Sequence, residues 1–114
     1  MKPNLKRVYA EPAPSDGTRI LVDRLWPRGL TKEKAHVDLW LKDVAPSTEL
    51  RKWFAHNPAR WTEFKSRYRS ELRKNVEPLA ALKQAVAKGP STLLYGAKDE
   101  EHNEAVVLLD LVER

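Results

Sequence analysis

The chain has 114 residues, 41% hydrophobic and 32% charged, which excludes a disordered chain and predicts one folded globular domain over residues 1–114. Its 21 lysines and arginines outnumber 16 aspartates and glutamates, and the resulting net charge of +5 favours an anionic partner. The absence of cysteine excludes a disulfide framework, a thiolate zinc site and a cysteine nucleophile. The sequence shows neither a signal-peptide pattern nor an apolar segment of membrane length, so we expect a cytoplasmic protein that has no membrane partner.

The first part of the chain is expected to form strands separated by turns. Apolar runs predict strands at residues 5–9 and 18–26, and the segment between them is rich in proline, serine and glycine. Pro27 ends the second run, Gly29 permits a change of direction, and Thr31 can cap a short helical turn. Residues 36–42 alternate apolar and polar side chains, which indicates either a sheet strand or an irregular edge segment.

Charged side chains interrupt the second predicted strand. Asp23 and Arg24 directly follow the apolar run 20–22, and Arg28 lies four residues further on. A guanidinium group is costly to remove from water unless an anion meets it. Either an internal carboxylate such as Glu71 or a bound ligand could supply that anion.

The middle of the chain is expected to be helical. Ser47 is a candidate N-cap for a helix that closes near His56 and Asn57, and Asn57 followed by Pro58 opens a longer helix. In that longer helix aromatic residues and a leucine recur at helical spacing, which favours core packing over base stacking. A third helix is predicted from Pro78 to residues 88–90, where a lysine, a glycine and a proline terminate it.

The last predicted unit is a strand followed by a helix. Residues 91–95 form a short apolar run, and Asp99 is a candidate cap for a helix over residues 100–113. Strands that alternate with helices favour an α/β class, with a mostly parallel sheet of about four strands flanked by helices in three layers.

Four segments of the sequence resemble one known family. They are RVY at residues 7–9, DGTRILVDRLWPRG at 16–29, APSTELRKWFAH at 45–56 and LLYGAKDEEHNEAVVL at 93–108. In this order they are similar to the domain of unknown function 488 family, YeaO-like branch, nearly from end to end. The resemblance implies a small Rossmann-like domain but no particular activity.

Parallel α/β sheets bind ligands beyond the carboxyl ends of their strands. The loops expected there carry cationic and hydrogen-bonding side chains, and guanidinium groups bind phosphate or carboxylate through paired hydrogen bonds. We therefore predict a cationic crevice for an anionic, phosphate-bearing ligand, such as a nucleotide or a nucleic acid. The candidate ligand-binding residues are Arg24, Arg28, Lys42, Ser47, Arg51, Lys98 and Asn103.

The alternative hypothesis is an enzyme that uses acid/base chemistry at the last junction between strand and helix. Its candidate catalytic residues are His102, Lys98, Tyr95 and Asp23. Histidine transfers protons near neutral pH, Tyr95 and Lys98 can orient or polarise a substrate, and Asp23 can take part in proton transfer. Two neighbouring glutamates at residues 100–101 oppose a bound phosphate at the same place. A capping or surface role for His102 therefore stays open.

Other binding chemistries have weaker support. The three histidines lack metal-ligand spacing, and the four glycines do not form a phosphate loop, so we expect neither a metal nor a cofactor. The basic helix of residues 58–75 is interrupted by Glu63 and Glu71, which favours a solvated surface over a nucleic-acid interface. A third possibility is a scaffold that docks a partner through Trp26 or Trp40. The oligomeric state stays open.

Overall fold

The computed structural model describes residues 2–113, in which four parallel strands form one sheet with the order β1-β4-β2-β3. The strands are β1 (Asn4–Arg7), β2 (Thr18–Leu21), β3 (Leu39–Trp40) and β4 (Ser91–Tyr95). β4 lies between β1 and β2, so that Leu93 is in register with both Leu5 and Ile20. This arrangement confirms the predicted α/β class with a parallel sheet of about four strands.

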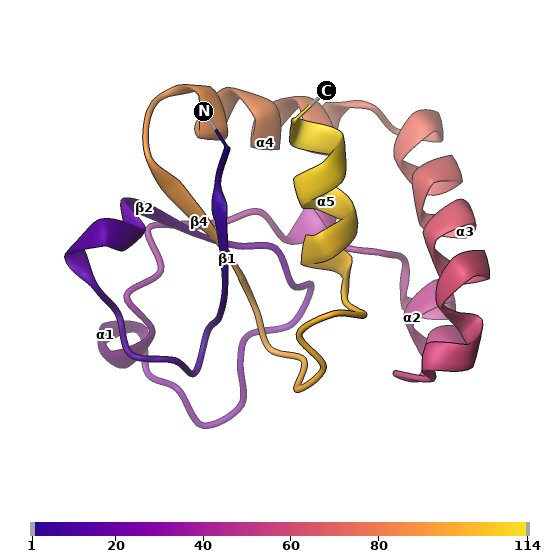
Figure 1. Cartoon of the computed structure of the whole chain (residues 1–114), viewed down its shortest axis with the longest axis horizontal. Helices are drawn as coiled ribbons and strands as arrows, with labels where there is room; N and C mark the ends of the chain where they lie inside the picture. The colour runs from indigo at the N-terminus through magenta and orange to yellow at the C-terminus, as the bar shows by residue number, and fades with distance from the viewer. Residues whose placement is uncertain (1, 114) are drawn as a thin grey trace.

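Helices and loops cover both faces of this sheet (Figure 1). The helices are α1 (Lys32–Ala35), α2 (Thr48–Phe54), α3 (Trp61–Lys74), α4 (Glu77–Ala87) and α5 (Glu104–Val112). One face, with Ile20 and Leu93, packs in the same apolar cluster as residues of α2 to α5. The other face, with Leu21 and Leu94, packs with Ala35 of α1 and with side chains of the loop after β2. Because side chains point alternately to the two faces along each strand, each face of the sheet carries its own layer of the core.

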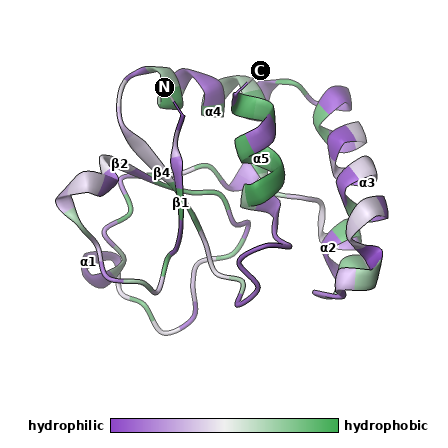
Figure 2. Ribbon diagram, in the orientation of Figure 1, coloured by the Kyte–Doolittle hydropathy of each residue, from purple (hydrophilic) through white to green (hydrophobic). Residues whose placement is uncertain are grey.

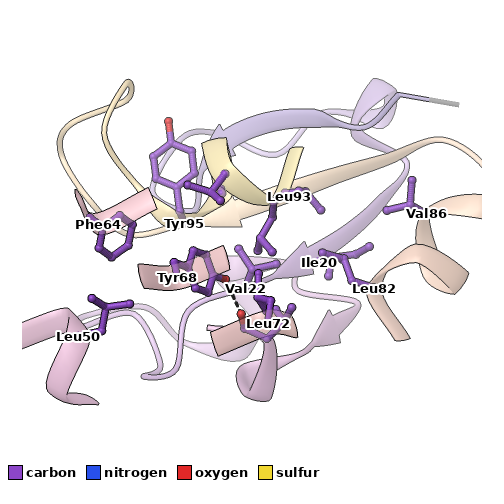
Figure 3. Packing of buried hydrophobic residues seen from close by; sticks show 14 of the residues in the cluster. Ile20, Val22, Leu50, Phe64, Tyr68, Leu72, Leu82, Val86, Leu93 and Tyr95 are labelled. Carbon is purple, nitrogen blue, oxygen red and sulfur yellow. Dashed lines mark hydrogen bonds between the residues drawn. The ribbon is translucent and has the colours of Figure 1, made fainter. Parts of the chain in front are cut away.

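The main core is largely aliphatic near the sheet and aromatic under α2 and α3 (Figure 3). Phe54 and Phe64 stack with their ring centroids 4.3 Å apart. The Tyr68 ring is fully buried, and its hydroxyl donates a hydrogen bond to the Val44 carbonyl. Figure 2 shows α5 as mostly hydrophobic and α3 as mixed, which agrees with their positions against the core and at the surface. Core packing of the aromatic stripe is thus confirmed.

Three predicted caps are confirmed, whereas several predicted strands are shorter in the structure; the first, predicted at 5–9, spans Asn4–Arg7. Thr31, Ser47 and Asn57 accept hydrogen bonds from the backbone two or three residues ahead, as N-caps do. The segment 36–42 contributes only the two-residue edge strand β3. β2 ends at Leu21 rather than at Trp26, and the chain then leaves the sheet toward the loop that carries Asp23.

The start of the last helix differs from the prediction. Asp99 does not cap it, because the Asp99 carboxylate accepts hydrogen bonds from the backbone of Glu101 and His102 and so closes a separate turn. α5 begins at Glu104, with Asn103 as its N-cap. His102 and Asn103 therefore precede the helix rather than lying within its first turn.

The arginine within β2 has an internal partner. Arg19 is buried, and its Nη1 lies 2.6 Å from Asp16 Oδ2 while its other nitrogens donate to the carbonyls of Ala35 and His36. Burial raises the pKa of Asp16, but hydrogen bonds from Lys6, the Ala13 backbone and Arg19 outweigh it, so that the pKa lies below its ordinary value. This guanidinium therefore stabilises the fold and is not available to a ligand.

None of the helices within residues 2–113 has the length and apolar character needed to cross a membrane.

Candidate functional site

A cavity of about 210 Å³ lies where β2 and β4 end. Because the two strands are parallel, the loops that follow them leave the sheet at the same edge. The loop before α2, the helices α2 and α3 and the start of α5 supply the remaining walls. The cavity is lined by Asp23, Arg24, Leu25, Ala45, Pro46, Arg51, Phe54, His56, Phe64, Gly96, Ala97 and Glu104.

Asp23 joins three strand ends at this cavity. Its Oδ2 accepts a hydrogen bond of 2.8 Å from the backbone N–H of Gly96, the residue that follows β4. Its carbonyl accepts one of 2.8 Å from Nε1 of Trp40 in β3. The Gly96 backbone approaches so closely that a Cβ there would lie 3.0 Å from Asp23 Oδ2. A carboxylate is therefore fixed at the mouth of the sheet.

Glu104, the first residue of α5, places a second carboxyl beside Asp23. Burial, a side-chain hydrogen bond with Asp23 and the charge of Asp23 together raise the pKa of Glu104 well above its ordinary value. Glu104 therefore keeps its proton to a higher pH than an isolated glutamate does. The cavity thus contains a hydrogen-bonded carboxyl pair.

Two arginines face the same cavity and differ in how the fold uses them. Arg24 donates from Nε to the Pro46 carbonyl at 3.2 Å and from Nη2 to the Ala45 carbonyl at 3.1 Å, so it holds the loop before α2 and does not pair with Glu71. Its Nη1 has no hydrogen-bond partner within residues 2–113. Arg51 is exposed on α2, and over the same described range its guanidinium has no hydrogen bond or ion pair.

Three other predicted ligand-binding residues lie away from the cavity lining. Arg28 and Lys98 are exposed, and Lys42 lies over the Trp40 ring with its Nζ 5.5 Å from the ring centroid. Lys42 and Arg24 both line a separate surface hollow with Trp40. The cationic side chains are thus spread along the edge of the sheet and are not collected in one crevice.

The polar groups of Ser47 and Asn103 serve the fold. Ser47 caps α2 and donates from its hydroxyl to Glu71 at 2.5 Å, while Glu71 also accepts from the Ser47 backbone at 2.9 Å. Asn103 is buried, caps α5 through its Oδ1, and donates from Nδ2 to the Asp99 carbonyl. Neither side chain lines the cavity.

Of the four candidate catalytic residues, Asp23 alone lines the cavity. His102 lies with its Nδ1 2.8 Å from Asp99 Oδ2, and its ring meets the Trp61 ring at a centroid distance of 5.3 Å. Tyr95 is buried in the core, where burial raises the pKa of its hydroxyl. In the described part of the chain, no hydrogen bond joins any two of His102, Lys98, Tyr95 and Asp23.

Sequence reasoning missed Glu104 and His56. Glu104 was not singled out because the predicted helix began at residue 100; recognising Asn103 as the N-cap would have placed Glu104 at the carboxyl edge of the sheet. His56 reaches the cavity because Ala55 and His56 both adopt left-handed backbone conformations, with φ of 48° and 55°, at the end of α2. No local sequence signal indicates that pair of conformations.

The fold and the cavity define a class of small Rossmann-like domains with a cavity, lined by both charged and apolar side chains, at the carboxyl edge of a parallel sheet. Within that class, the chain belongs to the DUF488 family, since its residues 2–114 match the family described as the inactive DUF488-N3 subclade. This match agrees with the resemblance found in the four sequence segments.

Its relatives include proteins from two distant bacteria. The uncharacterised protein YeaO of Escherichia coli is 46% identical over 105 residues, which cover 92% of this chain and 91% of YeaO. The uncharacterised protein Rv3073c of Mycobacterium tuberculosis is 42% identical over 106 residues, covering 93% of this chain and 89% of that protein. No solved structure matches the chain.

Proposed function

We propose that this protein is a binding module that takes an anionic, phosphate-bearing group into the cavity at the carboxyl edge of its sheet. The observation that carries the proposal is Arg51, which lines the cavity and whose guanidinium has no hydrogen bond or ion pair in the described chain, although its charge favours ionisation of Glu104. A guanidinium binds an oxyanion through two parallel hydrogen bonds, and the Nη1 of Arg24 adds a donor at the same cavity.

The electrostatics of the cavity support an anion. Arg24 and Arg51 bring two positive charges to the cavity, and the raised pKa of Glu104 opposes the ionisation of the second carboxyl there. The negative charge that would repel an anion is thereby reduced. The protein as a whole carries a net charge of +5, which favours the approach of an anion.

Binding is favoured over catalysis. The four residues of the acid/base hypothesis do not meet at the cavity, and the subclade that matches the chain is described as inactive. The cavity is also smaller than the roughly 300 to 1,000 Å³ of pockets for drug-sized ligands, so it suits a small anion or one end of a larger molecule such as a nucleotide or a nucleic acid. A cytoplasmic location stays a prediction.

Calorimetric titration and thermal shift with inorganic phosphate, propyl phosphate and a short single-stranded oligonucleotide test this function. A ligand that binds only the folded protein raises its stability, by about 2.7 kcal/mol at 100 times its Kd. We expect propyl phosphate to bind the wild type and to bind Arg51→Met at least 10-fold more weakly. Lys52→Met, which removes an exposed cation from the same helix outside the cavity, should leave binding unchanged.

Two results would contradict the proposal: no binding of any of the three probes, or equal loss of binding in the Arg51 and Lys52 variants. Equal loss would mean that binding depends on the positive charge of the surface as a whole and not on Arg51. If the oligonucleotide alone binds and Arg51→Met has no effect, the interface lies outside the cavity and the proposal also fails.

A further inference from the structure

The cavity combines polar groups of two kinds. Arg51 comes from α2 and is positively charged, whereas Asp23 follows β2 and Glu104 begins α5, and these two bear carboxyl groups. A site that bound only phosphate would have no use for a carboxyl pair, because carboxylates repel phosphate. The pair therefore requires a second explanation.

The fold accounts fully for Asp23 and only in part for Glu104. Asp23 secures the turn after β4 by accepting the Gly96 N–H. Glu104 stands in the first turn of α5, where a carboxylate is favoured, and its carboxyl bonds to its own backbone N–H and interacts with the charge of Arg51. None of these contacts requires the second carboxyl of Asp23 beside it, yet the Asp23 side chain is hydrogen-bonded to Glu104. Placing two carboxyls side by side is unfavourable compared with one carboxyl and one amide, since the second must keep its proton to avoid repulsion. A costly group that lines a cavity is a candidate for ligand recognition.

The chemistry of the pair defines what it can recognise. When Glu104 holds its proton it can donate to Asp23, and the carboxyl oxygens not used in that bond, by the Gly96 N–H or by the Glu104 backbone N–H remain as acceptors. Acceptors on a cavity wall require donors from the ligand, and the neutral donor that accompanies phosphate in small metabolites is the hydroxyl group.

We propose that the Asp23–Glu104 pair accepts hydrogen bonds from hydroxyl groups of the same ligand whose anionic group is bound by Arg51. The ligand class is then a polyhydroxylated phosphate ester, that is, a sugar phosphate, either free or as the ribose phosphate end of a nucleotide. This inference rests on the proposed function and adds the identity of the group that carries the phosphate.

The remaining walls and the size of the cavity agree with this class. Leu25, Pro46 and the edges of Phe54 and Phe64 provide apolar surface for the C–H face of a sugar ring. The volume of about 210 Å³ suits a sugar phosphate and leaves no room for a nucleobase beside it. In a nucleotide the base would lie outside the cavity, near the exposed side chain of Leu25.

Calorimetric titration with two matched probes tests the inference. Ribose 5-phosphate and propyl phosphate both carry a phosphate ester, but only the first carries ring hydroxyls. We expect the wild type to bind ribose 5-phosphate at least 10-fold more tightly, because a hydrogen bond to a charged group is worth about 1.5 to 3 kcal/mol. Glu104→Gln and Asp23→Asn should reduce this preference to less than about 3-fold, while propyl phosphate affinity is kept or increased because each variant removes a carboxyl that repels phosphate.

The outcomes separate this inference from the proposed function. Equal affinity of the wild type for the two probes overturns the inference, and the proposed function survives if propyl phosphate binding still depends on Arg51. Failure of both probes to bind overturns both. A preference for ribose 5-phosphate that persists in both carboxyl variants assigns hydroxyl recognition to other groups and also overturns the inference.

Adenosine 5′-monophosphate as a third probe distinguishes a free sugar phosphate from a nucleotide end. If a carboxyl variant does not fold, as judged by circular dichroism, the wild-type comparison and the other variant decide.

Discussion

Asp23 and Glu104 share a hydrogen bond although 80 positions separate them in the sequence, and they bring the end of β2 and the start of α5 to one cavity. The bond holds a proton between two carboxyls that line a space accessible to a ligand. Its effect on stability can be measured without knowing that ligand.

Glu104→Gln should raise the melting temperature near neutral pH by several degrees. The pKa of Glu104 is higher in the folded protein than its ordinary value of 4.5, so the folded state binds more protons than the unfolded state above that pH. The stability that this proton contributes is present in full below pH 4.5. It is lost as the pH rises through the pKa that Glu104 has in the folded protein. Glutamine cannot ionise, and the variant should not show this loss.

Thermal melts of the wild type and Glu104→Gln between pH 4 and pH 8 provide the measurement. The difference in melting temperature should grow with pH. Asp110→Asn, which removes a carboxylate of the same helix that pairs with Arg69 outside the cavity, should lower stability through the lost ion pair but should not reproduce that rise with pH. A difference that shrinks as the pH rises would show that Glu104 ionises more easily in the fold than outside it.

Asp16→Asn should destabilise the protein by about 3 kcal/mol, because it leaves the buried Arg19 guanidinium without a counter-charge. The pKa of Asp16 is lowered in the fold, so the stability that its charge contributes is present above its ordinary value of 3.8 and is lost as the pH falls below it. Urea unfolding at pH 7 and pH 3 measures both effects. A cost below about 1 kcal/mol at pH 7 would mean that the backbone carbonyls of Ala35 and His36 alone satisfy Arg19.

Gly17→Ala should cost at least about 2 kcal/mol, since two physical effects oppose the substitution. Gly17 has a φ of +64°, and an added Cβ would lie 2.2 Å from the Pro90 carbonyl oxygen, where the chain enters β4. Gly29→Ala is the matched control: its φ is +82°, but no atom lies within 4 Å of the added Cβ. The control should cost only the backbone strain, about 1 kcal/mol. Equal urea midpoints for the two variants would refute the close contact at Pro90.

Local signals made much of the fold predictable. The apolar run 91–95 coincides with β4, and Ser47 and Asn57 cap the elements that follow them, because a cap depends on a side chain and a backbone two or three residues away. The start of α5 was predicted wrongly because two residues near it can each cap a helix. Asp99 and Asn103 are both good caps, and the choice between them is set by the Asn103 side chain, which bonds to the Asp99 carbonyl as well as to the helix.

The site was predictable only in part. The rule for parallel sheets located the edge, but of the candidate residues only Asp23, Arg24 and Arg51 line the cavity, and Arg24 alone of these came from that rule. The sequence could not separate Arg51, whose guanidinium has no hydrogen bond or ion pair over residues 2–113, from Arg24, which holds two carbonyls of the loop before α2. That difference depends on the path of residues 45–46 in space. The pairing of Asp23 with Glu104 likewise depends on where α5 begins.

The central claim is that the cavity binds a phosphate-bearing ligand through Arg51, and a crystal structure of the protein grown with ribose 5-phosphate tests it most directly. The account predicts phosphate oxygens within about 3 Å of the Arg51 guanidinium, with ring hydroxyls beside Asp23 and Glu104. A phosphate bound only elsewhere, such as among the cations of α3, with the cavity holding none of the ligand, would contradict it.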